Sequence, residues 1–319
     1  MRRVLFAALA IALAACAHEG TPTAAPELPS TTGDALSTTT TTAAPATTVL
    51  STTTSVVTDV FGLAPPAAAR TPTGLAKQIT TAEQTIRDPA SDDLDLARAA
   101  LAQQVSYRQL GAHPEWDETV AAALPDDLRD VARLHADARR QFRGMHTKLS
   151  NTLPAWRIVR PEPADELLDA YRDAEGEFGI PWKYLAAINL VETGLGRIRG
   201  TSIAGAQGPM QFLPSTWEAY GAGGDINDTH DAIRGAANYL AANNGADDIA
   251  HALYRYNNSN RYVLGVQIYA DLIAEHPQAF LGFYHWGVWY LTDHGEVYLP
   301  IGYEQSEPIP VADYLARRT

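Results

Sequence analysis

The sequence predicts a mainly α fold, made of an N-terminal helical subdomain, a second helical domain and a C-terminal aromatic β-hairpin. Apolar residues recur at helical spacing between residues 74 and 276, and prolines and glycines separate the periodic segments. Aromatic residues then concentrate in the tail, where eight of the 24 residues from 280 to 303 are aromatic, against 8% of the chain. The first 73 residues show neither pattern and are expected to lie outside the fold.

Residues 1–16 have the composition of a targeting segment. Arg2 and Arg3 precede an apolar stretch, residues 4–13, that is too short to span a bilayer as a mature helix. The stretch ends in Leu13-Ala-Ala-Cys16, which resembles a bacterial lipoprotein signal, where the cysteine is lipidated and becomes the N-terminus. An ordinary secretory signal is the alternative. Either way the protein leaves the cytoplasm, and lipidation of Cys16, the only cysteine, leaves no thiol for a disulfide.

Residues 17–73 form a Thr/Ser/Pro-rich segment of low complexity. From Thr21 to Ala69 the only charged residues are Glu27, Asp34 and Asp59. No apolar face repeats along it, so we predict a disordered tether. The many hydroxyl groups also fit O-glycosylation, a weaker hypothesis.

The net charge bears on the choice of partner. The full chain carries −13, and removal of Arg2 and Arg3 with the signal leaves about −15. Binding to nucleic acid requires neutralisation of phosphates, so nucleic acid is not an expected partner.

Residues 74–150 are predicted to form a helical subdomain. Leu94, Ala97, Leu101 and Val105 fall at helical spacing, and no motif in this region carries chemistry. Packing or spacing is the expected role. Residues 151–163 contain three prolines and are expected to form a connector.

A second helical series follows over residues 164–276. Helices are predicted at 164–178, from Pro181 through Glu192, at 231–243, at 248–256 and at 261–276. In the tail, residues 277–319, short strands are predicted at 286–291 and 296–301 around Asp293-His-Gly295. This hairpin either caps the helical domain or forms an aromatic wall of a binding groove.

Glu192 is the main candidate for a catalytic residue. On a helix, Leu185, Ile188 and Asn189 share its face. A mostly apolar face and a nearby helix C-terminus both disfavour the ionised carboxylate, so the pKa of Glu192 should rise, as suits a general acid near neutral pH. A partly exposed glutamate at a helix end is the alternative.

Two further motifs supply the groove wall and the polar anchors that such an acid needs. Gly205-Ala-Gln207-Gly208 has almost no side-chain bulk, and Met210-Gln-Phe-Leu213 is predicted to begin a helix that presents the Gln211 amide. Tyr256 and Asn257 end another helix and offer polar anchors.

In this order and spacing, the motifs resemble the lysozyme-like lytic transglycosylases, over about residues 165–272. The resemblance rests on Val191-Glu-Thr-Gly-Leu-Gly196, Gly208-Pro-Met-Gln211 and Ala252-Leu-Tyr-Arg-Tyr256-Asn257. It implies a lysozyme-like catalytic domain at residues 164–276, with Glu192 as acid and then base. It further implies substrate-binding roles for Thr193, Gln207, Met210, Gln211, Tyr256 and Asn257. Thr193 stands where the family usually has serine, and Pro209 where it has a bulkier residue, which puts substrate preference in doubt.

The resemblance implies cleavage of the MurNAc–GlcNAc β-1,4 linkage of peptidoglycan without water, giving 1,6-anhydro-MurNAc ends. Peptidoglycan glycan strands would be the partner, with the lipid anchor in the cell membrane and the enzyme facing the cell wall. No cofactor or metal is expected, because the histidines form no ligand-spaced cluster. An acidic stretch at Asp225, Asn227, Asp228 and Asp231 is either a calcium loop, the source of a second catalytic carboxylate that would make the protein a hydrolase, or a loop in which Asp231 caps a helix. The cap is preferred.

Two other functions remain open. A hydrolytic muramidase on the same scaffold would give reducing ends instead of anhydro ends. A non-catalytic peptidoglycan-binding or scaffold lipoprotein would use residues 74–150 to hold a cell-wall protein partner.

Overall fold

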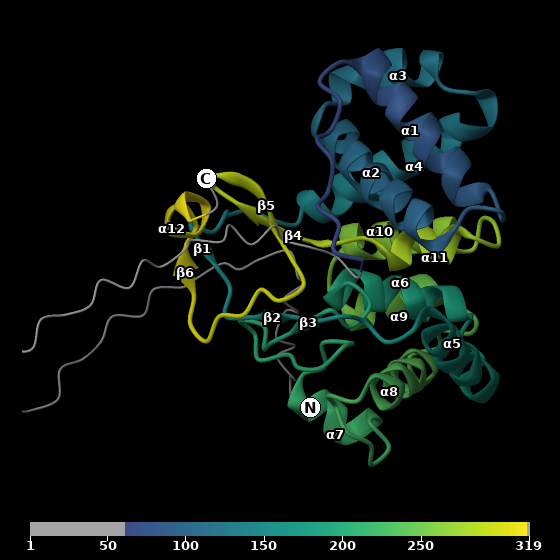
Figure 1. Ribbon diagram of the computed structural model, residues 1–319. Helices are drawn as coiled ribbons and strands as arrows, with labels where there is room; N and C mark the ends of the chain where they lie inside the picture. The colour runs from purple at the N-terminus through teal and green to yellow at the C-terminus, as the bar shows by residue number, and fades with distance from the viewer. Residues whose placement is uncertain (1–60, 318–319) are drawn as a thin grey trace, which may run out of the picture. The chain divides into compact units, whose positions relative to one another are not determined.

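Helices dominate the computed structural model, which describes residues 61–317 (Figure 1). The predicted fold class, mainly α, is confirmed for this part of the chain. The helices are α1 (Pro72–Arg87), α2 (Asp93–Ala112), the 3-10 turn η1 (Pro114–Trp116), α3 (Asp117–Ala123), α4 (Asp126–Arg143), α5 (Ala164–Phe178), α6 (Trp182–Thr193), α7 (Pro214–Tyr220), α8 (Thr229–Ala242), α9 (Ile249–Tyr256), α10 (Asn260–Ile273), α11 (Ala279–Tyr284) and α12 (Val311–Ala316).

The predicted signal with Cys16, and the tether as far as residue 60, lie outside the described residues. Across residues 61–317 no helix combines the length and the hydropathy needed to cross a bilayer.

Helices α1 to α4 occupy the upper part of Figure 1. The side chain of Thr71 accepts a hydrogen bond from the backbone of Gly74, and that of Asp92 accepts one from Asp95, so both long helices begin at a capping residue. Their inner faces form a small core of their own, which includes Leu75, Ile79, Tyr107, Val120 and Leu128.

The main core surrounds α6. Residues Leu185 to Asn189 on this helix are wholly buried, and α5, α8 and α10 pack against it. Phe142 and Ala138 of α4 belong to the same core as α6 and α10. The N-terminal helices therefore pack directly on the second helical region.

Three two-stranded antiparallel pairs lie beside the helices. They are β1 (Thr152–Leu153) with β6 (Ile309–Pro310), β2 (Arg157–Ile158) with β3 (Ile198–Arg199), and β4 (Val288–Thr292) with β5 (Gly295–Leu299). A third core joins these strands and includes Leu153, Ile158, Tyr290 and Leu299. The predicted connector at 151–163 thus supplies two strands. Trp286, expected in the first strand of the tail, instead belongs to the turn that follows α11, since its amide bonds to the carbonyl of Phe283.

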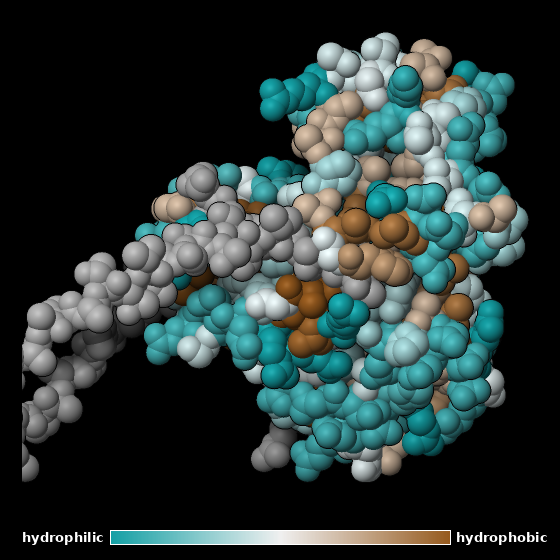
Figure 2. Space-filling view, viewed as in Figure 1, coloured by the Kyte–Doolittle hydropathy of each residue, from teal (hydrophilic) through white to brown (hydrophobic). Residues whose placement is uncertain are grey.

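Most of the face seen in Figure 2 is hydrophilic, and its larger apolar patches lie at mid-height. The large hydrophobic side chains that remain exposed in the described chain come from separate segments: Phe61, Leu149, Ile203, Tyr254 and Leu264. The apolar stripes of the helices are otherwise used in packing.

The predicted helix start at Met210 is wrong. Gln211 lies in the left-handed region with φ 51°, and the backbones of Gln207 and Phe212 pair across a tight loop. Helix α7 begins only at Pro214, which suits the first turn because it needs no amide donor.

Candidate active site

Glu192 lies in the last turn of α6 and is 1% exposed. Its Oε1 accepts a 2.8 Å hydrogen bond from the hydroxyl of Tyr262, and its Oε2 has no hydrogen-bond partner among the described residues. Burial raises the pKa of Glu192 to about 8, and the Tyr262 hydrogen bond acts in the opposite direction. The expected rise in pKa is confirmed. The carboxyl group is therefore protonated at neutral pH.

Helix α6 ends directly after Glu192 because Gly194 adopts the left-handed conformation, with φ 62°. The amide of Gly194 bonds to the carbonyl of Leu190, and that of Leu195 to Asn189. These bonds satisfy the last carbonyls of the helix in the manner of a glycine C-cap. The turn leaves the Glu192 side chain at the end of a rigid, buried helix.

Tyr262 is the residue that the sequence interpretation missed. It belongs to the first turn of α10, three residues after the capping Ser259. Its ring is parallel to that of Tyr256, with centroids 6.5 Å apart. The Tyr256 hydroxyl in turn donates a 2.7 Å hydrogen bond to the carbonyl of Met210. The only sequence signal was a tyrosine near a helix start, six residues after Tyr256.

The loop at residues 205–213 is bound to α6 through one carbonyl group. The carbonyl of Pro209 accepts a 2.9 Å bond from Nδ2 of Asn189 and a 2.6 Å bond from Oγ1 of Thr193. Oδ1 of Asn189 accepts from the Tyr171 hydroxyl, and Oγ1 of Thr193 accepts from the amide of Gly196. All these groups are buried, so the network fixes the loop relative to Glu192.

Most of the predicted substrate-binding residues are buried or already make contacts within the loop at residues 205–213. Thr193 and Met210 are wholly buried, so in this structure they hold the loop and present no surface to a ligand. Gln207 is half-buried, and its backbone pairs with Phe212. Gln211 is 5% exposed and its Nε2 donates to the carbonyl of Gly208.

Asn257 is a predicted anchor whose side chain has a buried polar atom without a partner in the described chain. It is 6% exposed, and its Nδ2 has no partner among the described residues. It directly follows Tyr256, whose pKa is raised by burial and then by the charge of Glu192. A buried amide donor and a buried carboxyl oxygen without partners are unusual unless a ligand satisfies them.

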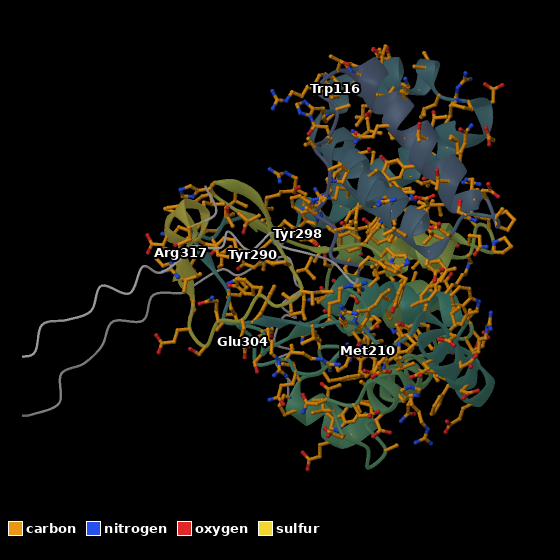
Figure 3. The ribbon with its side chains drawn as sticks, in the orientation of Figure 1. Trp116, Met210, Tyr290, Tyr298, Glu304 and Arg317 are labelled. Carbon is orange, nitrogen blue, oxygen red and sulfur yellow. The ribbon has the colours of Figure 1, made fainter. Side chains whose placement is uncertain are left out.

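Tyr290 and Tyr298 of the aromatic tail do not lie beside the loop at residues 205–213 (Figure 3). Tyr290 is 2% exposed and packs edge-on against Trp156, with ring centroids 5.4 Å apart. In Figure 3, Tyr290 and Tyr298 lie beside the strands, away from Met210. The face of the β4–β5 pair that carries Tyr290 is therefore used in the strand core.

The acidic stretch forms a helix cap and a turn. Asp228, and not the expected Asp231, caps α8 by accepting from the amide of Asp231. The carboxylate of Asp231 accepts a bond from the amide of Asp225. The prediction of Asp231 as the cap is thus off by one turn, because Asp231 closes the preceding loop.

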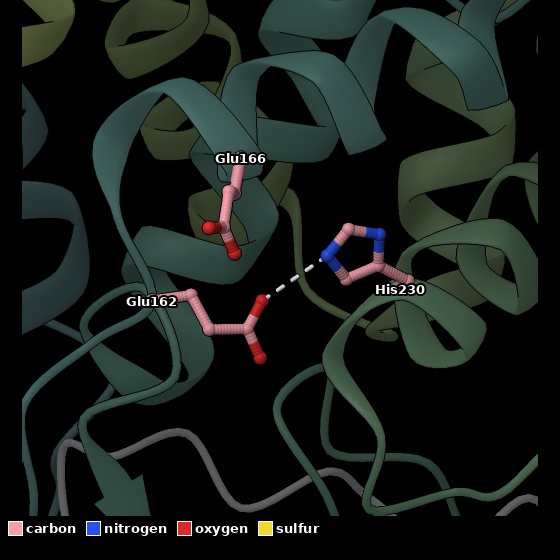
Figure 4. A group of neighbouring side chains, drawn as sticks. All are labelled: Glu162, Glu166 and His230. Carbon is pink, nitrogen blue, oxygen red and sulfur yellow. Dashed lines mark ion pairs between the residues drawn. The ribbon is translucent and has the colours of Figure 1, made fainter.

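One further polar cluster comes from segments far apart in the sequence. Glu162, Glu166 and His230 place ligand atoms within 4.8 Å of one another, and Nε2 of His230 lies 3.3 Å from Oε2 of Glu162 (Figure 4). Sequence spacing could not reveal this group. Glu166 and His230 are exposed, and exposed groups of this kind are common without an ion, so we assign no metal to it.

No protein-family model, curated protein or solved structure compared with the chain gave a match. The resemblance to the lytic transglycosylases therefore rests on the sequence motifs alone.

Proposed function

We propose that this protein is a peptidoglycan lytic transglycosylase of lysozyme-like type, with Glu192 as its catalytic residue. The observation that carries the proposal is the buried, protonated carboxyl group of Glu192, bonded on Oε1 and free on Oε2. The three motifs of the resemblance converge here, since the loop at 205–213 bonds to α6 and Tyr256 bonds to that loop.

The hydrogen bond from Tyr262 decides which oxygen acts. Because the phenol donates to Oε1, the acidic proton of Glu192 resides on Oε2. That oxygen would protonate the oxygen linking N-acetylmuramic acid to N-acetylglucosamine, and the glycosidic bond breaks. The acetamido group of the muramic acid would stabilise the cationic carbon.

The second half of the reaction reverses the role of Glu192. Its carboxylate would take the proton from the C6 hydroxyl of the same sugar as the C6 oxygen attacks C1. A C–O bond forms in place of the one broken, the proton returns to Glu192, and the product is a 1,6-anhydro end. Glycosidases that use water need a second carboxylate for the attacking group. In the described chain, the pKa of Glu192 is set by burial and by the hydrogen bond from Tyr262, and a second carboxylate is not among its causes.

The substrate must reach a buried oxygen. Glu192 is 1% exposed, so a sugar can contact Oε2 only after the residues covering it move. The unpartnered Nδ2 of Asn257 would then serve as a donor to the sugar. Gln211 would need to release the carbonyl of Gly208 to do the same. Lipidation at Cys16 would place this site on the outer side of the cell membrane.

Digestion of purified peptidoglycan tests the proposal. Wild type should release fragments with 1,6-anhydro ends, identified by mass spectrometry, and Glu192→Gln should release none. Glu177→Gln, an exposed glutamate paired with Arg234, is the matched control and should keep full activity. Reducing ends from the wild type would instead indicate a hydrolytic muramidase. Equal activity of wild type and Glu192→Gln would exclude the catalytic assignment.

A further inference from the structure

A cavity of about 100 Å³ lies between α2, α4, α6, α10 and the start of β4. Its charged lining residues are Arg108 and Arg139, and its aromatic lining includes Tyr269, Trp286 and Trp289. The proposed reaction uses none of these residues. Leu190 and Val191 of α6 also line it, and Glu192 is not among its lining residues.

Positive charge exceeds negative charge at this cavity. Oε1 of Glu296 accepts a bond from Arg139, and Oε2 of Glu296 lies 2.9 Å from Nε of Arg108. One carboxylate is therefore shared by two guanidinium groups. Arg139 is 8% exposed, and the Arg108 side chain is 11% exposed. A third guanidinium, that of Arg143, lies 3.9 Å from the same carboxylate.

Arg108 keeps unused donors inside this cavity. Its Nε is ion-paired with Glu296 without a well-aligned hydrogen bond, and its Nη2 has no hydrogen-bond partner among the described residues. Burial, and then repulsion by Arg139, lower the pKa of Arg108 to about 9. Burial alone would raise the pKa of Glu296, but Arg108 and Arg139 hold it below its usual value. A buried guanidinium with unsatisfied donors is costly even when it is paired with Glu296, and an anion that accepts from Nη2 would reduce that cost.

The walls of the cavity are held in place. Oε1 of Gln104 accepts from the Trp289 indole at 3.1 Å and from the Gly287 amide at 3.0 Å. Oε1 of Gln103 accepts from the Trp286 indole at 2.9 Å. The Arg108 guanidinium lies over the Trp289 ring, 4.8 Å from its centre. The polar and aromatic walls are therefore preorganised, which lowers the entropy cost of binding.

We propose that this cavity binds a carboxylate carried by a small apolar group. The carboxylate would be held by Arg108 and Arg139, and the apolar group would lie against Trp286 and Trp289. The guanidinium fork matches the two oxygens of a carboxylate. A volume of about 100 Å³ accommodates a carboxylate and a few carbons, and not a whole peptide.

Two sources share this chemistry. One is a free small carboxylic acid. The other is the carboxyl terminus of a peptide, such as the stem peptide of the glycan strand, and this second source rests on the proposed function. Because Glu192 does not line the cavity, its occupancy is testable apart from catalysis.

Calorimetric titration tests the binding site. The probes are N-acetyl-alanyl-alanine, the same dipeptide with a C-terminal amide, and acetate. The dipeptide acid should bind saturably and raise the melting temperature of the wild type, and the amide should bind at least tenfold more weakly. Tighter binding of the dipeptide than of acetate would assign a peptide terminus, and equal binding would assign a free acid. Equal binding of acid and amide, or no saturable binding of either acid, would overturn the proposal.

Variants locate the binding. Arg108→Met should lower the affinity for the acid at least tenfold without a loss of melting temperature, because Arg139 still pairs with Glu296. Arg98→Met, an exposed arginine paired with Asp95, should change nothing. Glu192→Gln should bind the acid as wild type does, so a failure of the catalytic assignment would not alter this result. Undiminished binding by Arg108→Met would refute the site.

Discussion

The hydroxyl of Tyr262 donates a 2.8 Å hydrogen bond to Oε1 of Glu192, across 70 positions of the sequence. The bond fixes the carboxyl group on one oxygen and leaves the other oxygen to carry the proton. It also stabilises the ionised form, against the effect of burial. Tyr262 thus positions the carboxyl group of Glu192, and its hydrogen bond reduces the rise in pKa that burial causes.

Replacement of Tyr262 by phenylalanine should raise the pKa of Glu192 further. The lost bond stabilises the carboxylate, so the alkaline limb of the pH–activity profile should move to higher pH. The loss of orientation should also lower kcat, by roughly tenfold for one positioning hydrogen bond of about 1–1.5 kcal/mol. Tyr254→Phe, at an exposed tyrosine of α9, is the control and should leave both quantities unchanged. An alkaline limb that moves to lower pH would contradict the role given to Tyr262.

Glu192 should make the protein less stable as the pH rises. Its folded pKa of about 8 lies above the ordinary 4.5, so between these values the folded state binds one proton more than the unfolded state. The contribution of Glu192 to stability is therefore fully present below pH 4.5 and is lost as the pH rises through about 8. The difference is on the order of 5 kcal/mol at most.

Calorimetry of Glu192→Gln measures this effect without any assay of activity. Glutamine stays neutral, so the variant should gain melting temperature over the wild type as the pH increases from 4.5 to 8.5. Glu177→Gln should show no such gain, because Arg234 keeps the pKa of Glu177 low. A melting difference that stays constant with pH would show that Glu192 ionises normally.

The hydroxyl of Thr193 should protect the Gly196 amide from hydrogen exchange. Its Oγ1 accepts from Gly196 and donates to the carbonyl of Pro209. Valine has the same shape without the hydroxyl, so Thr193→Val leaves a buried amide unpaired, at a cost of about 1–3 kcal/mol. Hydrogen exchange of the Gly196 amide should accelerate in Thr193→Val and stay slow in Thr193→Ser. Equal protection in the two variants would mean that the hydroxyl does not hold the turn.

Sequence-based prediction succeeds best for features that depend on the pattern of residues along one helix. The bounds of α5 follow from its apolar periodicity, and the structure has the helix at the same residues. The raised pKa of Glu192 follows from Leu185, Ile188 and Asn189 on one helix face, all of which are buried. In both cases the sequence signal lies within a single helix.

The errors arise where distant segments decide the conformation. Met210 to Leu213 resemble a helix start, but the pairing of Gln207 with Phe212 and the bonds of Pro209 to α6 impose a tight loop. Tyr262 was missed because only the packing of α10 on α6 brings its hydroxyl to Glu192. The cavity at Arg108 joins segments from α2 to β4, and no spacing in the sequence reveals it.

The tight loop gives a final prediction. A Cβ atom at Gly208 would lie 1.8 Å from the carbonyl oxygen of Ile226, and Gly208 has φ 73°. Alanine at this position would therefore adopt a strained backbone conformation. Its Cβ would also collide with the backbone of Ile226, which cannot move aside as the end of a flexible side chain could. Gly208→Ala should cost more than about 2–3 kcal/mol of stability, beyond the roughly 1 kcal/mol typical of a left-handed residue alone.

Gly205 is the matched control for this substitution. It lies in the same loop with φ 85°, but a Cβ atom there would meet nothing within 4 Å. Gly205→Ala should therefore show the backbone cost alone, about 1–2 kcal/mol, as measured by denaturant unfolding. The difference between the two variants isolates the collision with Ile226. If both variants lost the same stability, the loop at 205–213 would not pack against residue 226 as described.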